Sequence, residues 1–202
     1  MHFHIQLIDD PNHPERRTGS REAHWAYFDE HRDHFVARGA TQTDDGERTL
    51  SSVLFVEFDG WDEVRHFVDN EPHNCNSVFS EIRICRWHHA LDRTQRDFPR
   101  KDDQVCWYVR GFGAPGSNDR RNELVDAHRA YFASYDGKNF IARGGVLDDA
   151  GALWEGSANL IALPSRADVD AFLSEEPFYV NGLYDHVLVE RYKLGGRPGQ
   201  IV

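Results

Sequence analysis

The chain has 202 residues and a formal net charge of −11, with 34 acidic side chains against 23 basic ones. This balance excludes the basic surface that a nucleic acid or an acidic membrane requires, so we expect neither as a partner. Hydrophobic residues make up 40% of the chain and aromatic residues 12%, a composition that excludes a disordered chain and predicts a compact protein with its own core.

The first half of the chain alternates between strand and helix patterns. A short apolar strand at 3–8 is followed by a polar loop, and from about Glu22 the residues His24, Phe28 and His31 recur at helical spacing. The remaining elements, in chain order, are a strand opening with ARGA (37–40), a turn at DDG (44–46), a strand at SVLFVEF (52–58), an amphipathic helix at GWDEVRHFVDN (60–70) and a strand at EIRICRW (81–87).

The second half repeats this order, in places almost letter for letter. AHWAYF at 23–28 returns as AHRAYF at 127–132, and FVARGA at 35–40 returns as FIARGG at 140–145. The elements are a strand at VCWYVR (105–110), a helix from about Val125, a strand opening with ARGGV (142–146), a turn at Asp148-Asp149, a strand at ANLIAL (158–163), a helix at SRADVDAFLSE (165–175) and a strand at HVLVERY (186–192). Matches in the same order along both halves indicate two copies of one unit.

The order β-α-β-β-α-β is typical of ferredoxin-like folds, in which both helices cover one face of an antiparallel sheet. The other face must also be buried, and the second copy is the nearest partner for it. We therefore predict an α+β protein whose two ferredoxin-like repeats pack sheet to sheet as an intramolecular dimeric α+β barrel. The predicted division of the chain is a first repeat (1–91), a linker (92–103), a second repeat (104–196) and a tail (197–202).

The second repeat resembles the YCII-related (YciI-like) family of dimeric α+β barrel proteins. The resemblance rests on ARGGVLDDAGALWEGSANLIAL (142–163) and ADVDAFLSEEPFYVNGLYDHVLVERY (167–192), which combine a glycine pair, a hairpin turn and an acid-Pro-aromatic motif before the last strand. The first repeat is similar but departs at three places: His73 replaces the aromatic residue Phe178, Ser51 replaces Gly156, and Asn76-Ser77 replace Asn181-Gly182.

The resemblance implies a catalytic histidine on the first helix of each repeat, paired with an acidic residue. The histidines are His24 and His128, and the acids are Glu71 and Glu176, where the family usually has Asp. Such a pair suits general acid/base catalysis, because imidazole titrates near working pH and the carboxylate fixes its tautomer. The activities that the family implies include dehydrochlorination of a chlorinated hydroquinone.

We therefore predict a cofactor-independent lyase or isomerase that acts on a small polar substrate such as a hydroxylated aromatic. His128 is the first candidate for the base and His24 the second. Two alternatives stay open: a barrel that only binds a small ligand or a metal, and a structural subunit without a pocket. A histidine of this kind is also often a core residue that a backbone carbonyl or a neighbouring acid satisfies.

Two arginine pairs precede the histidines by seven or eight residues. They are Arg16 and Arg17 in the first repeat, and Arg120 and Arg121 in the second. The planar guanidinium suits a carboxylate or phenolate, so we predict these four side chains as substrate anchors in a loop over the pocket mouth. The alternative is solvated loop charge.

Histidine is concentrated in the first repeat, which holds ten of the twelve. His2 and His4 alternate along the first strand and therefore share a face. If that face lines the barrel, His2 and His4 would bind a divalent metal together with His24 or His73, since imidazole suits several divalent metals. This metal site is the alternative to a protein without a cofactor.

The three cysteines, Cys75, Cys85 and Cys106, have no CxxC spacing and predict neither a disulfide framework nor a thiolate zinc site. No basic N-terminal region with a following apolar run is present in the sequence, and no apolar stretch approaches 18 residues. We therefore expect a cytoplasmic protein with a small-molecule ligand. An alternative that stays open is a homodimer, in which two chains, each a pseudo-dimer of its own two repeats, associate through unpaired edge strands.

Overall fold

The computed structural model describes residues 1–99, 101, 103–197 and 200, so parts of the predicted linker and tail lie outside the described residues. The first repeat contains β1 (His2–Asp9), α1 (Arg16–Gly19), α2 (Arg21–Glu30), the 3-10 turn η1 (Arg32–His34), β2 (Phe35–Gln42), β3 (Thr49–Glu57), α3 (Trp61–Asp69), α4 (Pro72–Cys75) and β4 (Phe79–His89). The second contains β5 (Val105–Gly113), α5 (Asn118–Asp136), β6 (Phe140–Leu147), β7 (Trp154–Leu163), α6 (Arg166–Glu175), α7 (Pro177–Val180) and β8 (Tyr184–Leu194).

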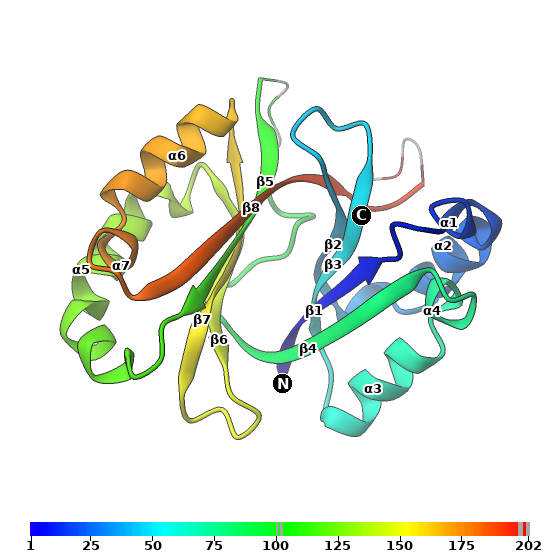
Figure 1. Ribbon diagram of the computed structural model, residues 1–202, viewed down its shortest axis with the longest axis horizontal. Coiled ribbons are helices and arrows are strands. Elements are labelled where there is room, and N and C mark those ends of the chain that lie inside the picture. Colours follow the sequence, from blue (N-terminus) through cyan, green and yellow to red (C-terminus); the bar gives the residue numbers. More distant parts are fainter. Residues whose placement is uncertain (100, 102, 198–199, 201–202) are drawn as a thin grey trace.

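The eight strands close into one barrel in the order β1-β3-β2-β8-β5-β7-β6-β4. Each repeat supplies four neighbouring antiparallel strands, and the two sheets join at β2 with β8 and at β4 with β6. The helices of both repeats cover the outside of the barrel (Figure 1). The predicted α+β architecture of two ferredoxin-like units is confirmed. Every described strand has two neighbours. None therefore offers the open edge through which two chains would form the homodimer considered above.

Glycine is required where the two sheets join. A Cβ on Gly39 would collide with the Lys193 carbonyl oxygen and the Tyr192 ring, and a Cβ on Gly144 would collide with the His88 carbonyl oxygen. These two glycines occupy equivalent positions in the ARGA and ARGG segments. The recurring glycine therefore has a packing explanation, since a larger residue would push the strands of the two repeats apart.

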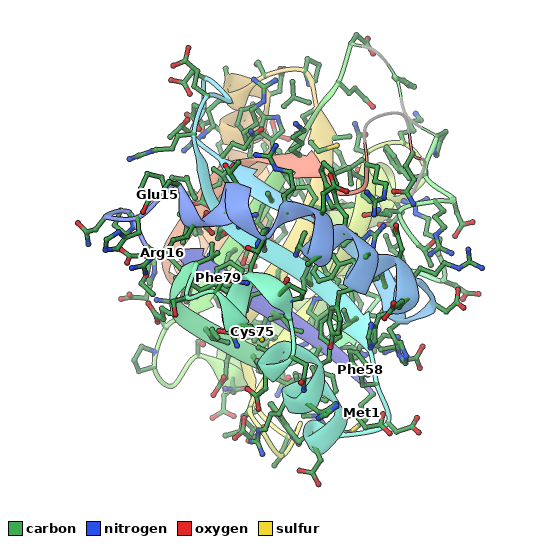
Figure 2. All side chains as sticks on the ribbon, turned by 90° about the vertical axis from the view of Figure 1, so that its right-hand side faces the viewer. Met1, Glu15, Arg16, Phe58, Cys75 and Phe79 are labelled. Carbon is green, nitrogen blue, oxygen red and sulfur yellow. The ribbon has the colours of Figure 1, made fainter. Side chains whose placement is uncertain are left out.

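Side chains alternate between the two faces of the sheet. On β1, Phe3, Ile5 and Leu7 pack with Phe28 of α2 in the core between the sheet and the helices, whereas His4 points into the barrel. Figure 2 looks onto the outer face of the first repeat, where its helices lie across the strands. A functional histidine on α2 therefore lies on the opposite side of the sheet from the barrel interior.

Two helical segments differ from the predicted loops. Arg16 and Arg17 form the start of the short helix α1, and α5 begins at Asn118, well before the expected Val125. The arginine pair of the second repeat therefore lies in the first turns of a helix. No helix among the described residues is both long enough and apolar enough to cross a membrane.

Candidate active site

The predicted histidine and acid of the first repeat lie in direct contact. His24 projects from α2, and its Nδ1 lies 2.6 Å from Oε1 of Glu71. Glu71 is fully buried at the N-terminus of α4, where its two carboxylate oxygens also accept the backbone N–H groups of His73 and Asn74 at 3.0 Å. Pro72 stands at the first helical position, and the Glu71 side chain caps the helix in the way a shorter Asp usually does. The carboxylate is therefore held in place and turned towards His24.

The second repeat has the same arrangement. Nδ1 of His128 lies 2.6 Å from Oε1 of Glu176, which caps α7 by accepting the backbone N–H groups of Phe178 and Tyr179 at 3.0 and 2.7 Å. The structure thus brings both predicted pairs together. The extra methylene of Glu relative to the usual Asp still allows one side chain to reach the histidine and cap the helix.

A second histidine lies flat against His24. The His73 ring is stacked on the His24 ring at a centroid distance of 4.1 Å and an angle of 13°, and its Nδ1 bonds Ser20 Oγ at 2.7 Å. Burial, followed by electrostatic repulsion from the nearby His24 and Arg17 when the ring is protonated, lowers the pKa of His73 to about 2. His73 is therefore a neutral ring at working pH. In the second repeat, Phe178 stacks on His128 in the same way at 4.0 Å.

A hollow of about 580 Å³ lies beside His24. We call it the His24 hollow; its lining residues are Arg17, Arg21, His24, Trp25, Phe28, Arg38, Gly39, Ala40, Thr49, Ser52, His73, Lys193, Leu194, Gly195, Gly196, Arg197 and Gln200. The last six belong to β8 and the segment after it, so the second repeat builds one wall of the first repeat's hollow. No described residue is hydrogen-bonded to Nε2 of His24, which leaves this nitrogen available to a ligand.

Of the four predicted arginine anchors, Arg17 lines the His24 hollow. Its guanidinium makes two bonds of 2.7 and 2.6 Å to Asp9 and one of 2.9 Å to Ser52 Oγ. Arg16 instead donates to the backbone oxygen of Ser77 on the surface. In the second repeat, Arg120 is exposed, and Arg121 lies 5.7 Å from the centre of the Trp154 ring. The structure thus brings Arg17, and none of the other three, to the hollow beside His24.

Sequence reasoning missed Arg38. This residue is 3% exposed on β2, lines the His24 hollow and bonds Asp29 Oδ1 through Nη2 at 3.0 Å. Its Nη1 is buried without a hydrogen-bond partner among the described residues. The available signal was a charged residue inside the otherwise apolar FVARGA strand, repeated as Arg143 in FIARGG. Buried charges without full pairing often mark functional sites.

The second repeat has a bulky indole where the first has a small side chain. Trp154 occupies the strand position of Thr49, and its indole is 4% exposed with its ring centre 5.5 Å from that of Phe178. A cavity of about 10 Å³ touches Glu176, and His128 is not among the residues that line it. The Phe178 ring that stacks on His128 is therefore backed by the indole, whereas His24 lines a hollow.

The side chains do not support the predicted metal site. His4 points into the barrel, where its Nε2 bonds Tyr108 Oη at 2.8 Å, while His24 and His73 lie on the helix side of the sheet. His24, Glu71 and His73 do place ligand atoms within 4.8 Å of one another. The two imidazole rings are nearly parallel, however, so their lone pairs do not converge on one ion as a tetrahedral site requires.

The barrel of two repeats, each with a helix-borne histidine on a capping glutamate, defines a class of dimeric α+β barrel proteins. The model of the YCII-related domain matches residues 1–88 and 107–193, and the chain belongs to this family. No match was found among curated proteins.

Three solved structures are similar to this chain, and the first two share its barrel fold. A putative chlorite dismutase is 10% identical, with 96% of each chain covered and a TM-score of 0.60. A heme-binding protein from Thermus thermophilus is 16% identical over 95% of this chain and 90% of its own, with a TM-score of 0.52. The 5-chloro-2-hydroxyhydroquinone dehydrochlorinase of Burkholderia phenoliruptrix is 30% identical over 45% of this chain and 96% of its own, with a TM-score of 0.42.

The sequence predicted a protein without a cofactor. This prediction is wrong for the fold, because similar barrels include a heme-binding protein. The side chains around His24 nevertheless do not fit a porphyrin. Five cationic side chains line the His24 hollow, and its aromatic walls are limited to Trp25 and Phe28 beside the two histidines. The faces of a porphyrin need apolar walls, which these residues do not provide, so no catalytic step is assigned to heme.

Proposed function

We propose that the protein is an enzyme of the lyase or isomerase type, in which His24 moves a proton on a small polar substrate bound in the His24 hollow. One observation carries this proposal. Nδ1 of His24 is bonded to the buried carboxylate of Glu71, so its other nitrogen is left for a ligand in a hollow of about 580 Å³. Geometry of this kind is what a general base needs.

Glu71 prepares His24 for both halves of a proton transfer. Accepting the Nδ1–H bond selects the tautomer in which Nε2 has a free lone pair, so Nε2 is able to take a proton from the substrate. The imidazolium that forms is stabilised by the adjacent carboxylate, which does not need to move because the helix N–H groups hold it. Nε2 then returns the proton to another atom of the substrate or to a leaving group.

His73 supports this role through its neutrality. A charged ring stacked at 4.1 Å would oppose protonation of His24, but the burial of His73 keeps it uncharged. The stacked ring also covers one face of the imidazole and restricts its rotation. The hollow and the neutral His73 ring favour His24 as the base, whereas the sequence analysis predicts His128 as the first candidate.

The test compares matched variants of the two histidines. A panel of small hydroxylated and halogenated aromatics is screened by NMR for product formation and for deuterium uptake from solvent. We expect His24→Gln to lower turnover about 100-fold or more, a typical loss for a general base, while His128→Gln keeps it. Circular dichroism melting curves of the two variants provide the control for folding. Equal turnover by His24→Gln and the parent protein would refute the proposal and favour a barrel that only binds its ligand.

A further inference from the structure

The charge of the His24 hollow is opposite to that of the whole protein. Its described lining contains five basic side chains and no acidic one, although acidic residues outnumber basic ones by 34 to 23 in the chain. The basic residues are Arg17, Arg21, Arg38, Lys193 and Arg197. Cations concentrated in a hollow raise the local concentration of anions.

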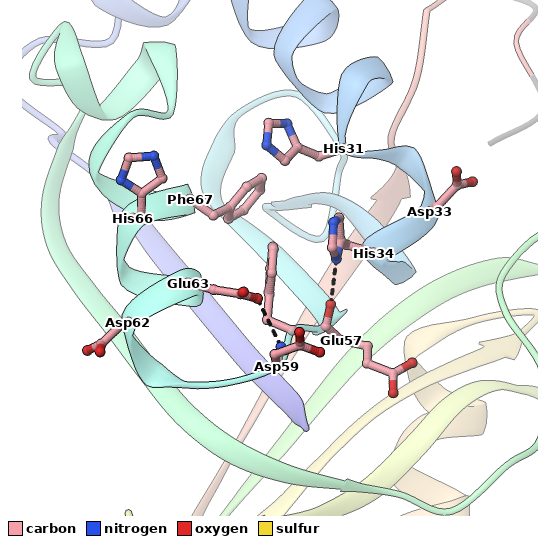
Figure 3. Close-up of a pocket in the computed structure, with 10 residues that line it drawn as sticks. His31, Asp33, His34, Glu57, Asp59, Asp62, Glu63, His66 and Phe67 are labelled. Carbon is pink, nitrogen blue, oxygen red and sulfur yellow. Dashed lines mark hydrogen bonds between the residues drawn. The ribbon is translucent and has the colours of Figure 1, made fainter.

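A second hollow shows that this charge is not a general property of the surface. The acidic hollow, of about 830 Å³, lies at the far end of α2 beside α3, and its described lining has no Lys or Arg (Figure 3). It is lined by His31, Asp33, His34, Glu57, Phe58, Asp59, Asp62, Glu63, His66 and Phe67. The two hollows of the first repeat therefore differ in the sign of their charge, and the hollow beside the histidine pair is the positive one.

Arg38 is the most deeply buried of the five cations. Its side chain is 4% exposed and packs near the Phe28 and Phe35 rings, with its guanidinium carbon 5.7 and 5.2 Å from the ring centres. Its partner Asp29 is shared, because Arg197 approaches the same carboxylate at 3.4 Å. Arg197 also pairs with Glu22 at 2.7 Å, so the group that remains unsatisfied here is Nη1 of Arg38 rather than a net charge.

The equivalent arginine of the second repeat is paired with its carboxylate through two nitrogens. Arg143 makes two parallel bonds to Asp136, Nε to Oδ1 at 2.5 Å and Nη2 to Oδ2 at 2.7 Å. Arg38 makes one such bond and leaves Nη1 unpaired among the described residues. The unpaired donor therefore lies in the repeat that has the open hollow. This location favours a role of the donor in ligand binding over a role in the fold.

We propose that the substrate is a small organic anion, and that Arg38 binds its carboxylate or phenolate group while the reacting part faces His24. This inference rests on the proposed function for the identity of the site. An anion would supply the acceptor that Nη1 lacks, and charge-assisted bonds in a site shielded from water are strong. Because Nη1 is itself out of reach of water, the guanidinium must turn slightly towards the hollow when the anion enters.

The binding test uses three probes of similar size: benzoate, 4-nitrophenolate and the neutral benzamide. Calorimetry measures their affinity, and the imidazole NMR signals of His24 report whether each probe enters the hollow. We expect benzoate or 4-nitrophenolate to bind about 10- to 100-fold more tightly than benzamide. The better of the two anions identifies the carboxylate or the phenolate as the recognised group. Equal affinity for benzamide and both anions would overturn the inference.

Arg38→Met should remove the preference for the anion, and Arg143→Met, the matched variant of the second repeat, should retain it. If Arg38→Met does not fold, Arg38→Lys takes its place, because it keeps the charge but loses the planar fork and should bind benzoate more weakly. A preference that survives both substitutions of Arg38 would overturn the assignment.

The inference and the proposed function fail in different ways. His24→Gln should still bind the anion, since the pairing group is Arg38. Anion binding that depends on Arg38, without turnover of any anionic aromatic in the panel, would support the inference and count against the enzyme. Turnover that depends on His24 but is confined to neutral substrates would support the enzyme and overturn the inference.

Discussion

The two repeats hold the same histidine-glutamate pair in different surroundings. Both pairs have a bond of 2.6 Å, and both glutamates cap a short helix. Around His24 there is a hollow, whereas the His128 pair is packed near the indole of Trp154. The capping role alone is a structural reason to retain the acid, so the pair by itself does not define an active site. The open space and the unpaired cation beside it distinguish the first repeat.

The largest expected effect concerns the role that both glutamates share. Glu71→Ala and Glu176→Ala each leave two backbone N–H groups and an imidazole N–H without an acceptor in a buried place. We expect each to lower the free energy of unfolding by about 3 kcal/mol, measured by urea denaturation. Turnover at substrate saturation should fall sharply in the folded fraction of Glu71→Ala and stay unchanged for Glu176→Ala. Equal loss of turnover in both variants would mean that both repeats catalyse.

The next prediction concerns position 49, where the first repeat has Thr49 and the second has Trp154 at the equivalent position. Thr49→Trp, combined with Ala40→Gly to match Gly145 beside the indole, should close the His24 hollow and lower benzoate affinity about 100-fold. The bond between His24 and Glu71 should survive, as the 15N shifts of the imidazole would show. Normal binding by this variant would place the ligand elsewhere.

The converse substitution, Trp154→Thr, serves as the matched control. It should open space beside His128 without creating an anion site, because both donors that Arg143 directs to Asp136 remain paired. Benzoate is titrated into the double variant Trp154→Thr/Arg38→Met, in which the anion site of the first repeat is removed and any binding is assigned to the second repeat. Binding there would show that space, rather than the unpaired arginine, determines recognition.

The fold was predictable from the sequence because it depends on local patterns that occur twice. Alternating apolar residues, helical spacing around His24 and the repeated segments together determine the order of elements. Both histidine-glutamate pairs were also predictable, since the resemblance and the duplication pointed to the same positions.

The features that separate the repeats depend on contacts distant in sequence. Asp29 and Asp136 bind equivalent arginines from positions that do not correspond in the two repeats, so the repeat alignment could not reveal which arginine is fully paired. The wall that Lys193 and Arg197 add to the His24 hollow comes from the other repeat. Barrel closure brings these residues together, and no local pattern predicts it.

The smallest expected effect tests the one aromatic position at which the pairs differ, His73 against Phe178. Above the usual histidine pKa of 6.5, His73 is neutral in both the folded and the unfolded chain and does not affect the pH dependence of stability. Below 6.5 the unfolded chain takes up a proton that the folded protein, with a His73 pKa of about 2, does not accept. Stability is therefore lost as the pH falls, by up to about 1.4 kcal/mol per pH unit for this residue.

His73→Phe should remove that contribution and give the first repeat the stacking partner of the second. Urea denaturation at a series of pH values should show equal slopes for the variant and the parent above pH 6.5, and a shallower loss for the variant below it. His4 and His89, whose pKa values are also lowered by burial, are present in both proteins and leave a common residual slope. Parallel curves throughout would mean that His73 takes up its proton equally in the folded and the unfolded chain, and below pH 6.5 a charged ring stacked on His24 would then oppose the proposed proton transfer.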